Sequence, residues 1–266
     1  MKDKVVVITG GASGIGRLMS LKFAAQGARV VAWDMNRNGL SHLENEAAEK
    51  HLFVKGMACD VSDKNAVYEL AKTVARDIGA VDVLVNNAGV VSGKPLLNTP
   101  DEHIIATMNV NVLAHFWTCK AFLPSMLERN SGHIVTIASA AGLIGVKGLA
   151  DYSASKFAVF GFDESIRMEL RALKSAVRTT VVCPFFINTG MFDGVKTKFP
   201  LLLPILQSGY VADRIVHAVL KNKTRLILPW FASTTLLLRL FPPAILDVIA
   251  GFFGINHSMD EFKGRS

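Results

Sequence analysis

Residues 5–16 read VVVITGGASGIG, and this stretch decides the fold of the N-terminal part of the chain. The β-branched run predicts a buried strand, the glycines predict a tight turn, and the apolar-periodic segment that follows predicts a helix. The N-terminus of such a helix presents free N–H groups and a positive dipole end, which suit a pyrophosphate. We therefore expect this turn to bind a dinucleotide. The expected contacts are Gly10, Ser13, Gly14, Ile15 and Gly16.

Short β-branched runs alternate with longer helical patterns along the rest of the chain, which predicts βαβ units. The expected fold is a single α/β domain, a Rossmann-type doubly wound parallel sheet with helices on both faces. The expected strands are 4–8, 29–33, 52–57, 81–85, 133–137 and 178–182, with a candidate seventh at 225–228. The expected helices are 14–27, 38–49, 63–78, 101–129 (in one or two pieces), 151–174 and 211–222. Ser62 is expected to cap the third helix.

The composition of the 266-residue chain suits a fully covered parallel sheet, because half of the residues are hydrophobic and only 19% are charged. Three widely spaced cysteines, Cys59, Cys119 and Cys183, indicate neither a disulfide framework nor a zinc site, so we expect no metal and a reducing, intracellular compartment. The net charge of +7 is spread without a basic block, so no nucleic-acid partner is expected. The first apolar run is too short for a signal peptide.

Asp34 stands at the end of the second expected strand, where a carboxylate can accept hydrogen bonds from the adenosine ribose. The same negative charge would repel a 2′-phosphate, so we expect NAD rather than NADP as the cofactor. Arg37, three residues further on, could instead swing toward such a phosphate. An alternative role for Asp34 is to cap the helix that starts near Asn38.

Tyr152 and Lys156 are four residues apart, so on a helix they share one face. An isolated pair of this kind usually marks a solvated helix face. Here the pair follows, in order, the glycine turn, the segment Asn86-Asn87-Ala88-Gly89, and Ser139 after the fifth expected strand. These four motifs resemble, in order and spacing, those of the short-chain dehydrogenase/reductase family from residue 4 to about residue 190.

The chemistry of alcohol oxidation explains why these residues converge. The reaction needs a base for the hydroxyl proton, and a phenol with a pKa of about 10 is too weak at neutral pH. The Lys156 ammonium and the positive nicotinamide of an oxidised cofactor both favour the phenolate, so Tyr152 is the expected acid/base. The resemblance implies that Ser139 binds the substrate oxygen and that Lys156 also holds the nicotinamide ribose. It further implies Asn111 as a fourth catalytic residue in a water relay to the lysine, with Asn109 as the alternative.

The resemblance also implies cofactor contacts outside the glycine turn. Asp60 and Val61 resemble the pair that contacts the adenine, and Thr189 matches the residue that contacts the carboxamide. Where the family usually has Pro-Gly, this chain has Pro184-Phe185, so we expect a ring in the pocket wall. The remaining implied contacts are Asn87, Ala88, Gly89, Pro184 and Ile187. For Asn86 and Asn87 a purely structural turn is an equally good interpretation.

Three stretches are similar to one branch of the family, that of retinol dehydrogenases and type-11 and type-13 17β-hydroxysteroid dehydrogenases: WDMNRNGL (33–40), NVNVLAHFWTCKAFLPSMLERNSGHIVTIASAAG (109–142) and MDEFKGR (259–265). The resemblance implies a lipophilic substrate, which would be a retinoid, a steroid or a long-chain lipid alcohol. It also implies a place in the cytoplasm or at the membrane of the endoplasmic reticulum or lipid droplets. Apolar residues expected beside Tyr152, about half of them core residues, are Leu143, Ile144, Val146, Phe185, Phe186, Met191, Phe192 and Phe199.

The C-terminal part of the chain has a different composition. We divide the chain into a dinucleotide-binding and catalytic domain (1–229) and an apolar extension (230–266) packed on it. Residues 230–256 carry only Arg239 and Asp247 as charged residues, and Pro242-Pro243 splits them into pieces too short to span a bilayer, so two short apolar helices are expected. The branch commonly begins with an apolar anchor, for which residues 1–4 are too few, so membrane contact is expected from the tail. A lid or a dimer contact is an equally good interpretation of the tail.

The family resemblance implies a homodimer or homotetramer built partly on the helices at 101–129 and 151–174. These helices carry more apolar residues than one face of a sheet should cover, among them Phe116, Trp117, Phe122, Phe157, Phe160 and Phe162. Two other functions stay open: an NADPH-dependent 3-oxoacyl-carrier-protein-type reductase, and a non-catalytic dinucleotide-sensing binding protein. Asp34 argues against the first, and the intact set of Ser139, Tyr152 and Lys156 argues against the second.

Overall fold

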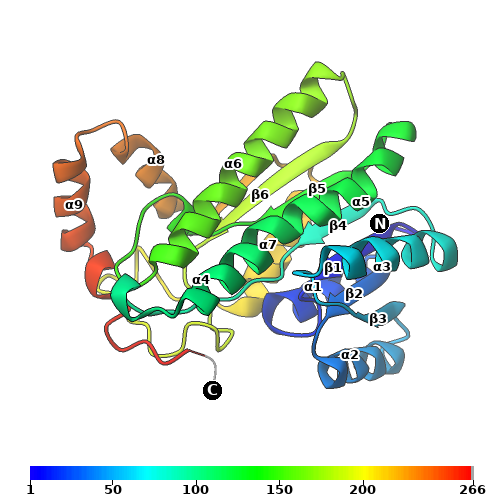
Figure 1. Cartoon of the computed structure of the whole chain (residues 1–266), viewed down its shortest axis with the longest axis horizontal. Coiled ribbons are helices and arrows are strands. Elements are labelled where there is room, and N and C mark those ends of the chain that lie inside the picture. The colour runs from blue at the N-terminus through cyan, green and yellow to red at the C-terminus, as the bar shows by residue number, and fades with distance from the viewer. Residues whose placement is uncertain (265–266) are drawn as a thin grey trace.

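A sheet of seven parallel strands forms the centre of the protein, in the order β3-β2-β1-β4-β5-β6-β7 (Figure 1). The structure is a computed structural model and describes residues 1–264; Arg265, the last residue of the MDEFKGR stretch, lies outside the described residues. The strands are β1 Val5–Thr9, β2 Arg29–Asp34, β3 Val54–Ala58, β4 Val83–Asn86, β5 His133–Ile137, β6 Arg178–Pro184 and β7 Arg225–Leu228. The predicted doubly wound parallel sheet is confirmed, with the candidate seventh strand as part of it.

Helices cover both faces of the sheet, because its central strands are buried at every position and so need cover on both sides. Val7 and Ile8 are adjacent in β1 and point to opposite faces, so each is fully buried in a different cluster. Ile8 packs in the layer with helices α1 and α7, and Val7 packs in the layer with α3, α5 and α6. The main helices are α1 Gly14–Ala25, α2 Arg37–Glu49, α3 Lys64–Asp77, α4 Asp101–Met108, α5 Ala114–Glu128, α6 Ala150–Ala172 and α7 Ser208–Leu220.

Several boundaries differ from the expectation by one to three residues, and two differences have a clear physical reason. β3 begins at Val54 and not at residue 52, because the N–H of Leu52 donates to the carbonyl of Ala47 (2.8 Å) and still belongs to the end of α2. The expected helix at 101–129 consists of α4, a π-helical turn at Asn109–Leu113, and α5. A π-turn widens a helix locally and is frequent at functional sites, so residues 109–113 are candidates for the functional site.

Asp63, and not Ser62, caps α3. The Asp63 side chain accepts hydrogen bonds from the N–H groups of Asn65 (2.8 Å) and Ala66 (3.2 Å). The Ser62 hydroxyl donates instead to the carboxylate of Asp60 (2.7 Å). The prediction of Ser62 as the cap is therefore wrong, because Asp63 lies one residue closer to the helix and a carboxylate is an equally good cap.

The edge of the sheet at which a ligand site is expected is the one formed by the carboxyl ends of the strands. β1 pairs with β2 on one side and with β4 on the other, so the strand order reverses at β1. In open parallel sheets, ligands bind at the carboxyl ends of the strands beside such a reversal. The turns that follow β1, β4 and β5 therefore come together there.

The tail after β7 contains α8 (Thr235–Leu238) and α9 (Pro243–Phe252), drawn in orange and red at one end of the molecule in Figure 1. The expectation of short helices separated by the Pro242-Pro243 break is confirmed, with Pro243 as the first residue of α9. Within residues 1–264, no helix combines the length and the apolar character needed to cross a membrane.

Candidate active site

The glycine turn after β1 packs closely against the start of α1. A Cβ atom on Gly16 would lie 2.0 Å from the carbonyl oxygen of Gly10, so only glycine permits this approach. Gly10 itself has a positive φ of 62°, which glycine adopts without strain. Helix α1 begins at Gly14, and the N–H groups of its first turn have no partner within the helix. This turn therefore presents backbone donors to an anion, as expected from the sequence.

The turn after β4 is tied to the glycine turn by Thr9. The Thr9 hydroxyl accepts hydrogen bonds from the N–H groups of Asn87 (2.9 Å) and Ala88 (3.0 Å). The amide of Asn87 donates in return to the carbonyls of Thr9 (2.9 Å) and Gly10 (3.2 Å). Asn87 thus has the structural turn role that the sequence left open, and it also lines the pocket. The sequence interpretation missed Thr9, the residue that fixes both turns.

Asp34 points back toward the glycine turn. Its carboxylate accepts hydrogen bonds from the N–H groups of Ala12 and Asn36, both at 3.0 Å. The cap of α2 is Asn36, whose side chain accepts from the N–H of Gly39 (2.9 Å), so Asp34 is not the cap of that helix. Arg37 is exposed at the start of α2. The Asp34 carboxylate therefore lies at the end of β2, where the adenosine of a dinucleotide would lie, and Arg37 follows it as the first residue of α2.

Asp60 and Val61 follow β3, close to the end of β2 where the adenosine is expected. The N–H of Cys59 donates to the carbonyl of Asp34 (3.0 Å), which brings the turn after β3 beside the end of β2. Asp60 binds both the N–H (2.9 Å) and the hydroxyl of Ser62, and Val61 is buried in the core. Neither residue lines the main pocket, so their expected contact with adenine stays a prediction.

Tyr152 and Lys156 lie together in the first turns of α6, and both are buried, with 6% and 3% of their surface exposed. The ammonium of Lys156 lies 5.5 Å from the centre of the Tyr152 ring and donates to the carbonyl of Ile137 (2.9 Å). Burial raises the pKa of Tyr152 to about 12, which the nearby Ser139 opposes. Burial also lowers the pKa of Lys156 to about 8. Without a further positive charge the proton therefore stays on the phenol.

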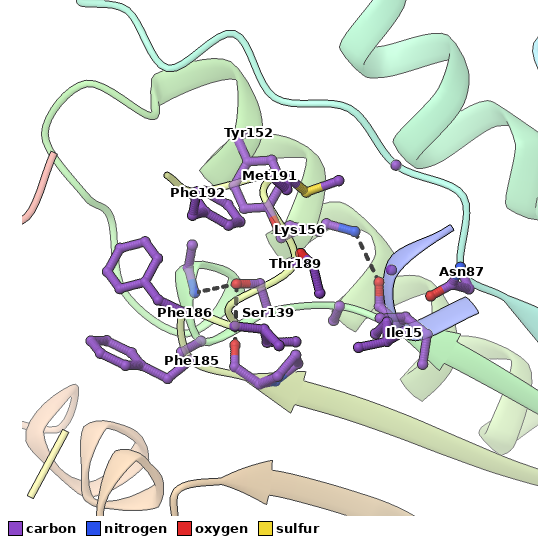
Figure 2. A pocket seen from close by; sticks show the side chains of 18 of the residues that line it. Ile15, Asn87, Ser139, Tyr152, Lys156, Phe185, Phe186, Thr189, Met191 and Phe192 are labelled. Atoms are coloured by element: carbon purple, nitrogen blue, oxygen red, sulfur yellow. Dashed lines mark hydrogen bonds between the residues drawn. The ribbon is translucent and has the colours of Figure 1, made fainter. Parts of the chain in front are cut away.

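Ser139 follows β5 directly and faces the same pocket (Figure 2). Its hydroxyl oxygen accepts a hydrogen bond from the N–H of Ala141 (3.1 Å), and the hydroxyl donates to the carbonyl of Pro184 (3.4 Å). The N–H contact orients the oxygen, while the long contact to Pro184 is weak. A substrate oxygen can therefore replace Pro184 as the acceptor of the Ser139 proton.

Asn111 lies in the π-helical turn and is completely buried. Its side chain accepts from the N–H of Val90 (2.8 Å) and donates to the carbonyl of Val90 (2.9 Å) and to the hydroxyl of Ser155 (3.0 Å). Asn109 is only partly buried, which favours Asn111 over the alternative. All three side-chain bonds are to the protein, so the side chain positions the loop after β4 and the catalytic helix.

A pocket of about 140 Å³ joins these groups (Figure 2). Its polar end is the glycine turn and its middle contains Ser139, Tyr152 and Lys156. Predicted cofactor residues that line it are Gly10, Ser13, Gly14, Ile15, Gly16, Asn87, Ala88, Gly89, Pro184, Ile187 and Thr189. Backbone donors at one end and a glycine-lined floor fit a nicotinamide dinucleotide. Asp34, Asp60, Val61 and Asn111 lie outside this pocket.

The other end of the pocket is apolar. Phe185, at the position where the family has glycine, lines it as predicted, and the Tyr152 ring meets the edge of Phe192 with 5.6 Å between the ring centres. Of the eight apolar residues expected there, Ile144, Val146, Phe185, Phe186, Met191 and Phe192 line the pocket. Leu143 and Phe199 do not, because Leu143 is buried in the core and Phe199 packs on Phe252 and Phe253 of the tail.

The C-terminal residues contribute to this site, which agrees with the lid interpretation of the tail, although the sequence did not indicate which residues would do so. Ile255 lines the pocket, and Met259 is buried in one cluster with Tyr152, Phe186 and Phe192. The MDEFKGR stretch carried a family resemblance but no periodicity that would locate it. These contacts therefore had no local signal in the sequence.

The comparisons with known proteins agree with the geometry. The sequence model of the family described as short chain dehydrogenase matches residues 4–199. Human epidermal retinol dehydrogenase 2 is 46% identical over 97% of this chain and 85% of its own length. Short-chain dehydrogenase/reductase family 16C member 6 of Bos taurus is 45% identical over 98% of this chain and 84% of its own length.

Solved structures are also similar. A short chain dehydrogenase/reductase from Burkholderia phymatum in complex with NAD has a TM-score of 0.79 and 28% identity, covering 88% of this chain and 92% of that one. A single-residue variant of actinorhodin polyketide ketoreductase with NADPH has a TM-score of 0.77 and 29% identity, covering 86% of this chain and 97% of that one. The two structures contain different nicotinamide cofactors on the same fold.

Proposed function

The chain belongs to the short-chain dehydrogenase family and is an oxidoreductase, and on this premise we propose that it uses NAD to interconvert a lipophilic alcohol and its carbonyl compound. The observation that carries the proposal is the burial of Tyr152 and Lys156 between a glycine-lined end and an aromatic end of one pocket. The polar end suits the dinucleotide, and the apolar end suits a substrate with little polarity. Relatives named retinol dehydrogenases favour an alcohol of retinoid character.

Tyr152 is the proposed acid/base. A dinucleotide held at the glycine turn would, in its oxidised form, supply the hydride acceptor and a positive charge beside the phenol. That charge and the Lys156 ammonium together stabilise the phenolate, against the burial that holds the pKa of Tyr152 near 12. The Tyr152 oxygen then takes the hydroxyl proton of the alcohol, and in the reverse reaction it returns the proton to the carbonyl oxygen.

Ser139 and Asn111 support this step in different ways. Ser139 donates a hydrogen bond to the substrate oxygen and so orients it toward the phenol. The side chain of Asn111 makes three hydrogen bonds, to Val90 and Ser155, which leaves its amide oxygen one acceptor site for the water of the proposed relay to Lys156. Asn111 acts in this proposal as a positioning residue for the loop after β4.

The preference for NAD rests on Asp34. Its carboxylate is held toward the glycine turn by Ala12 and would face a 2′-phosphate as a like charge. The competing function, an NADPH-dependent 3-oxoacyl-carrier-protein-type reductase, would need Arg37 to neutralise that phosphate. Equal turnover with NAD and NADP would mean that the Asp34 carboxylate does not select between the two cofactors.

The tail is proposed to touch a membrane or lipid surface. Side chains on and around α8 and α9 leave an apolar surface exposed, including Leu240 (82%) and Val248 (73%). Exposed patches of this kind indicate a contact site, and the net charge of +7 suits anionic headgroups. We propose a peripheral association of this kind, at the endoplasmic reticulum or lipid droplets, with residues 230–266 as an extension of the domain 1–229. A lid or a dimer contact is the alternative.

A homodimer through α5 and α6 is also proposed, on a smaller apolar surface than the sequence suggested. Phe122 and Phe162 are buried in the core, so they add nothing to an exposed face. Phe157 and Phe160 lie beneath the guanidinium groups of Arg239 (4.8 Å) and Arg225 (5.1 Å). Phe116 of α5 has 41% of its surface exposed, so its ring can contact a second subunit.

The test of the enzymatic proposal is a substrate screen. Purified protein is incubated with NAD and, in turn, retinol, steroid alcohols and long-chain alcohols, and NADH formation is measured. The Tyr152→Phe variant serves as the blank. NADH binding without turnover of any alcohol by the wild type would refute the proposal and favour the dinucleotide-sensing binding protein.

A further inference from the structure

The C-terminal segment, residues 258–264, docks beside the catalytic pocket. Ser258 and Met259 are 3% and 8% exposed, although they lie within nine residues of the chain end. The N–H of Lys196 donates to the carbonyl of Ser258 (3.2 Å), and the N–H of Lys263 donates to the carbonyl of Asp193 (2.8 Å). The segment is therefore hydrogen-bonded at two points to the loop that follows β6 and carries Met191 and Phe192.

Two glycines allow this docking. A Cβ atom on Gly93 would lie 1.9 Å from the Phe262 ring, and one on Gly194 would lie 2.0 Å from the carbonyl oxygen of Glu261. Both glycines have positive φ values, 64° and 86°. Gly93 belongs to the loop after β4 and Gly194 to the loop after β6, so the segment fits between two loops that border the site. Any other residue at these positions would displace it.

A second cavity, of about 300 Å³, lies beneath this segment. Gly89 and Met191 line both this cavity and the catalytic pocket, so the two spaces meet at these residues. The lining residues are Gly89, Val90, Val91, Ser92, Met191, Phe262, Lys263 and Gly264. Met191 and the glycine backbone stand between the catalytic pocket and the second cavity, and a methionine side chain is unbranched and flexible.

One wall of the second cavity is rigid and the other is the C-terminal segment. Asn111 binds both the N–H and the carbonyl of Val90, at 2.8 and 2.9 Å. The Ser92 hydroxyl donates to the buried carboxylate of Asp151 (2.8 Å), next to Tyr152 in the sequence. Because Ser92 is engaged in this way, the wall offers mainly the apolar side chains of Val90 and Val91. The opposite wall consists of Phe262, Lys263 and Gly264, and the ring of Phe262 is its apolar side chain.

We propose that the second cavity is the subsite for the apolar chain of the substrate, and that Phe262 and Val91 determine which chains it accepts. The inference rests on the proposed oxidation of a lipophilic alcohol. The catalytic pocket must hold both the dinucleotide, at its glycine-lined end, and the reacting carbon beside the nicotinamide, which leaves little of it for a long apolar chain. A longer substrate has to extend out of the catalytic pocket, and the second cavity continues from it at Met191.

The test compares a long and a short alcohol, hexadecanol and butanol, with NAD as cofactor. Phe262→Ala removes one wall, and Val91→Phe fills the cavity from the other. Each variant is expected to lower the ratio of kcat/KM for hexadecanol to that for butanol by about tenfold or more, since apolar pockets discriminate by roughly this factor. Phe262→Leu should restore part of the ratio. Phe53→Ala, a half-exposed phenylalanine beside β3, is the matched control and should leave the ratio unchanged.

Two results would overturn the proposal. An unchanged ratio in both variants would mean that the chain leaves the pocket elsewhere, for example along Phe185 and Ile255. An equal loss for both alcohols would mean that the C-terminal segment only holds the site together. The affinity of the NADH complex for hexadecanol, measured through the change in NADH fluorescence, gives the same comparison of variants without turnover. A wild type that binds hexadecanol but oxidises none of the alcohols in the substrate screen would refute the proposed reaction, while weaker binding of hexadecanol by the variants would still support the subsite.

Discussion

Replacement of Lys156 by methionine tests the electrostatic basis of the proposed mechanism. Methionine is unbranched like lysine, so it fills a similar space but removes the charge. Lys156 is 3% exposed and its ammonium lies 5.5 Å from the centre of the Tyr152 ring. At an effective dielectric constant of about 20, two unit charges at this distance interact by about 3 kcal/mol. Since 1.36 kcal/mol corresponds to one pKa unit, the loss of the ammonium should raise the pKa of Tyr152 in the NAD complex by about two.

The sign of the effect on activity follows from the form of Tyr152 that reacts. Alcohol oxidation needs the phenolate, so kcat increases as the pH rises through the pKa of Tyr152. A higher pKa moves this acidic limb to higher pH, by about two pH units, and lowers kcat at neutral pH by about a hundredfold. The assay is kcat for oxidation against pH at saturating NAD. Saturation matters because Lys156 is also proposed to bind the nicotinamide ribose, and the variant should have a higher Kd for NADH.

The control is Lys120→Met, which makes the same change at an exposed position of α5. Its pH profile should match that of the wild type. If the acidic limb of Lys156→Met stays at the wild-type pH while kcat falls, the lysine does not stabilise the phenolate. An unchanged Kd for NADH would separately remove its proposed ribose contact.

Four further predictions address the base, the cofactor, the tail and the assembly. Tyr152→Phe keeps the ring but removes the proton-transfer group, so turnover should fall by about 10²–10⁴-fold or more with an almost unchanged Kd for NADH; a fully active variant contradicts the mechanism. Asp34→Ala should shift the ratio of kcat/KM values toward NADP, and a wild type that already prefers NADP contradicts the premise. The wild type should float with anionic liposomes, and a variant with serine at the exposed tail positions should not, provided that circular dichroism shows both folded; a wild type that stays unbound favours a lid or dimer contact. The tail positions are Leu237, Phe241 and Phe252. Phe116→Asp should shift a homodimer toward monomer in sedimentation velocity, and a wild type that is monomeric at micromolar concentration speaks against the α5–α6 interface.

The site could be located from the sequence because its parts are local patterns at strand ends. The glycine turn and Ser139 each follow a predicted strand, the Tyr152–Lys156 pair lies in the first turns of a predicted helix, and the carboxyl ends of parallel strands meet at one edge. Once the strands are in register, these side chains converge without further information. The position of Asp34 at the end of β2 was predictable for the same reason, but its hydrogen bond to Ala12 was not.

The sequence could not decide which of two neighbouring residues belongs to the site, because that depends on contacts between distant parts of the fold. Asn109 and Asn111 are two residues apart and equally polar, and only the tertiary structure buries Asn111 against Val90 and Ser155. The apolar residues near Tyr152 divide in the same way. Leu143 and Ile144 are adjacent in the chain, but Leu143 is in the core and Ile144 lines the pocket. Hydrophobicity predicts burial, but it does not say against which partner.

By itself, the sequence determined the βαβ order, the glycine turn and the helix face shared by Tyr152 and Lys156, because each depends on residues within a few turns of one another. Only the tertiary structure decided how the C-terminal residues complete the site. Phe262 meets Gly93, and Glu261 meets Gly194, across long stretches of chain. Such contacts need space that other elements leave open, and no local periodicity encodes that space. The walls of the second cavity therefore depend on how distant segments pack, while each catalytic motif is set by local structure and the sheet brings the motifs together.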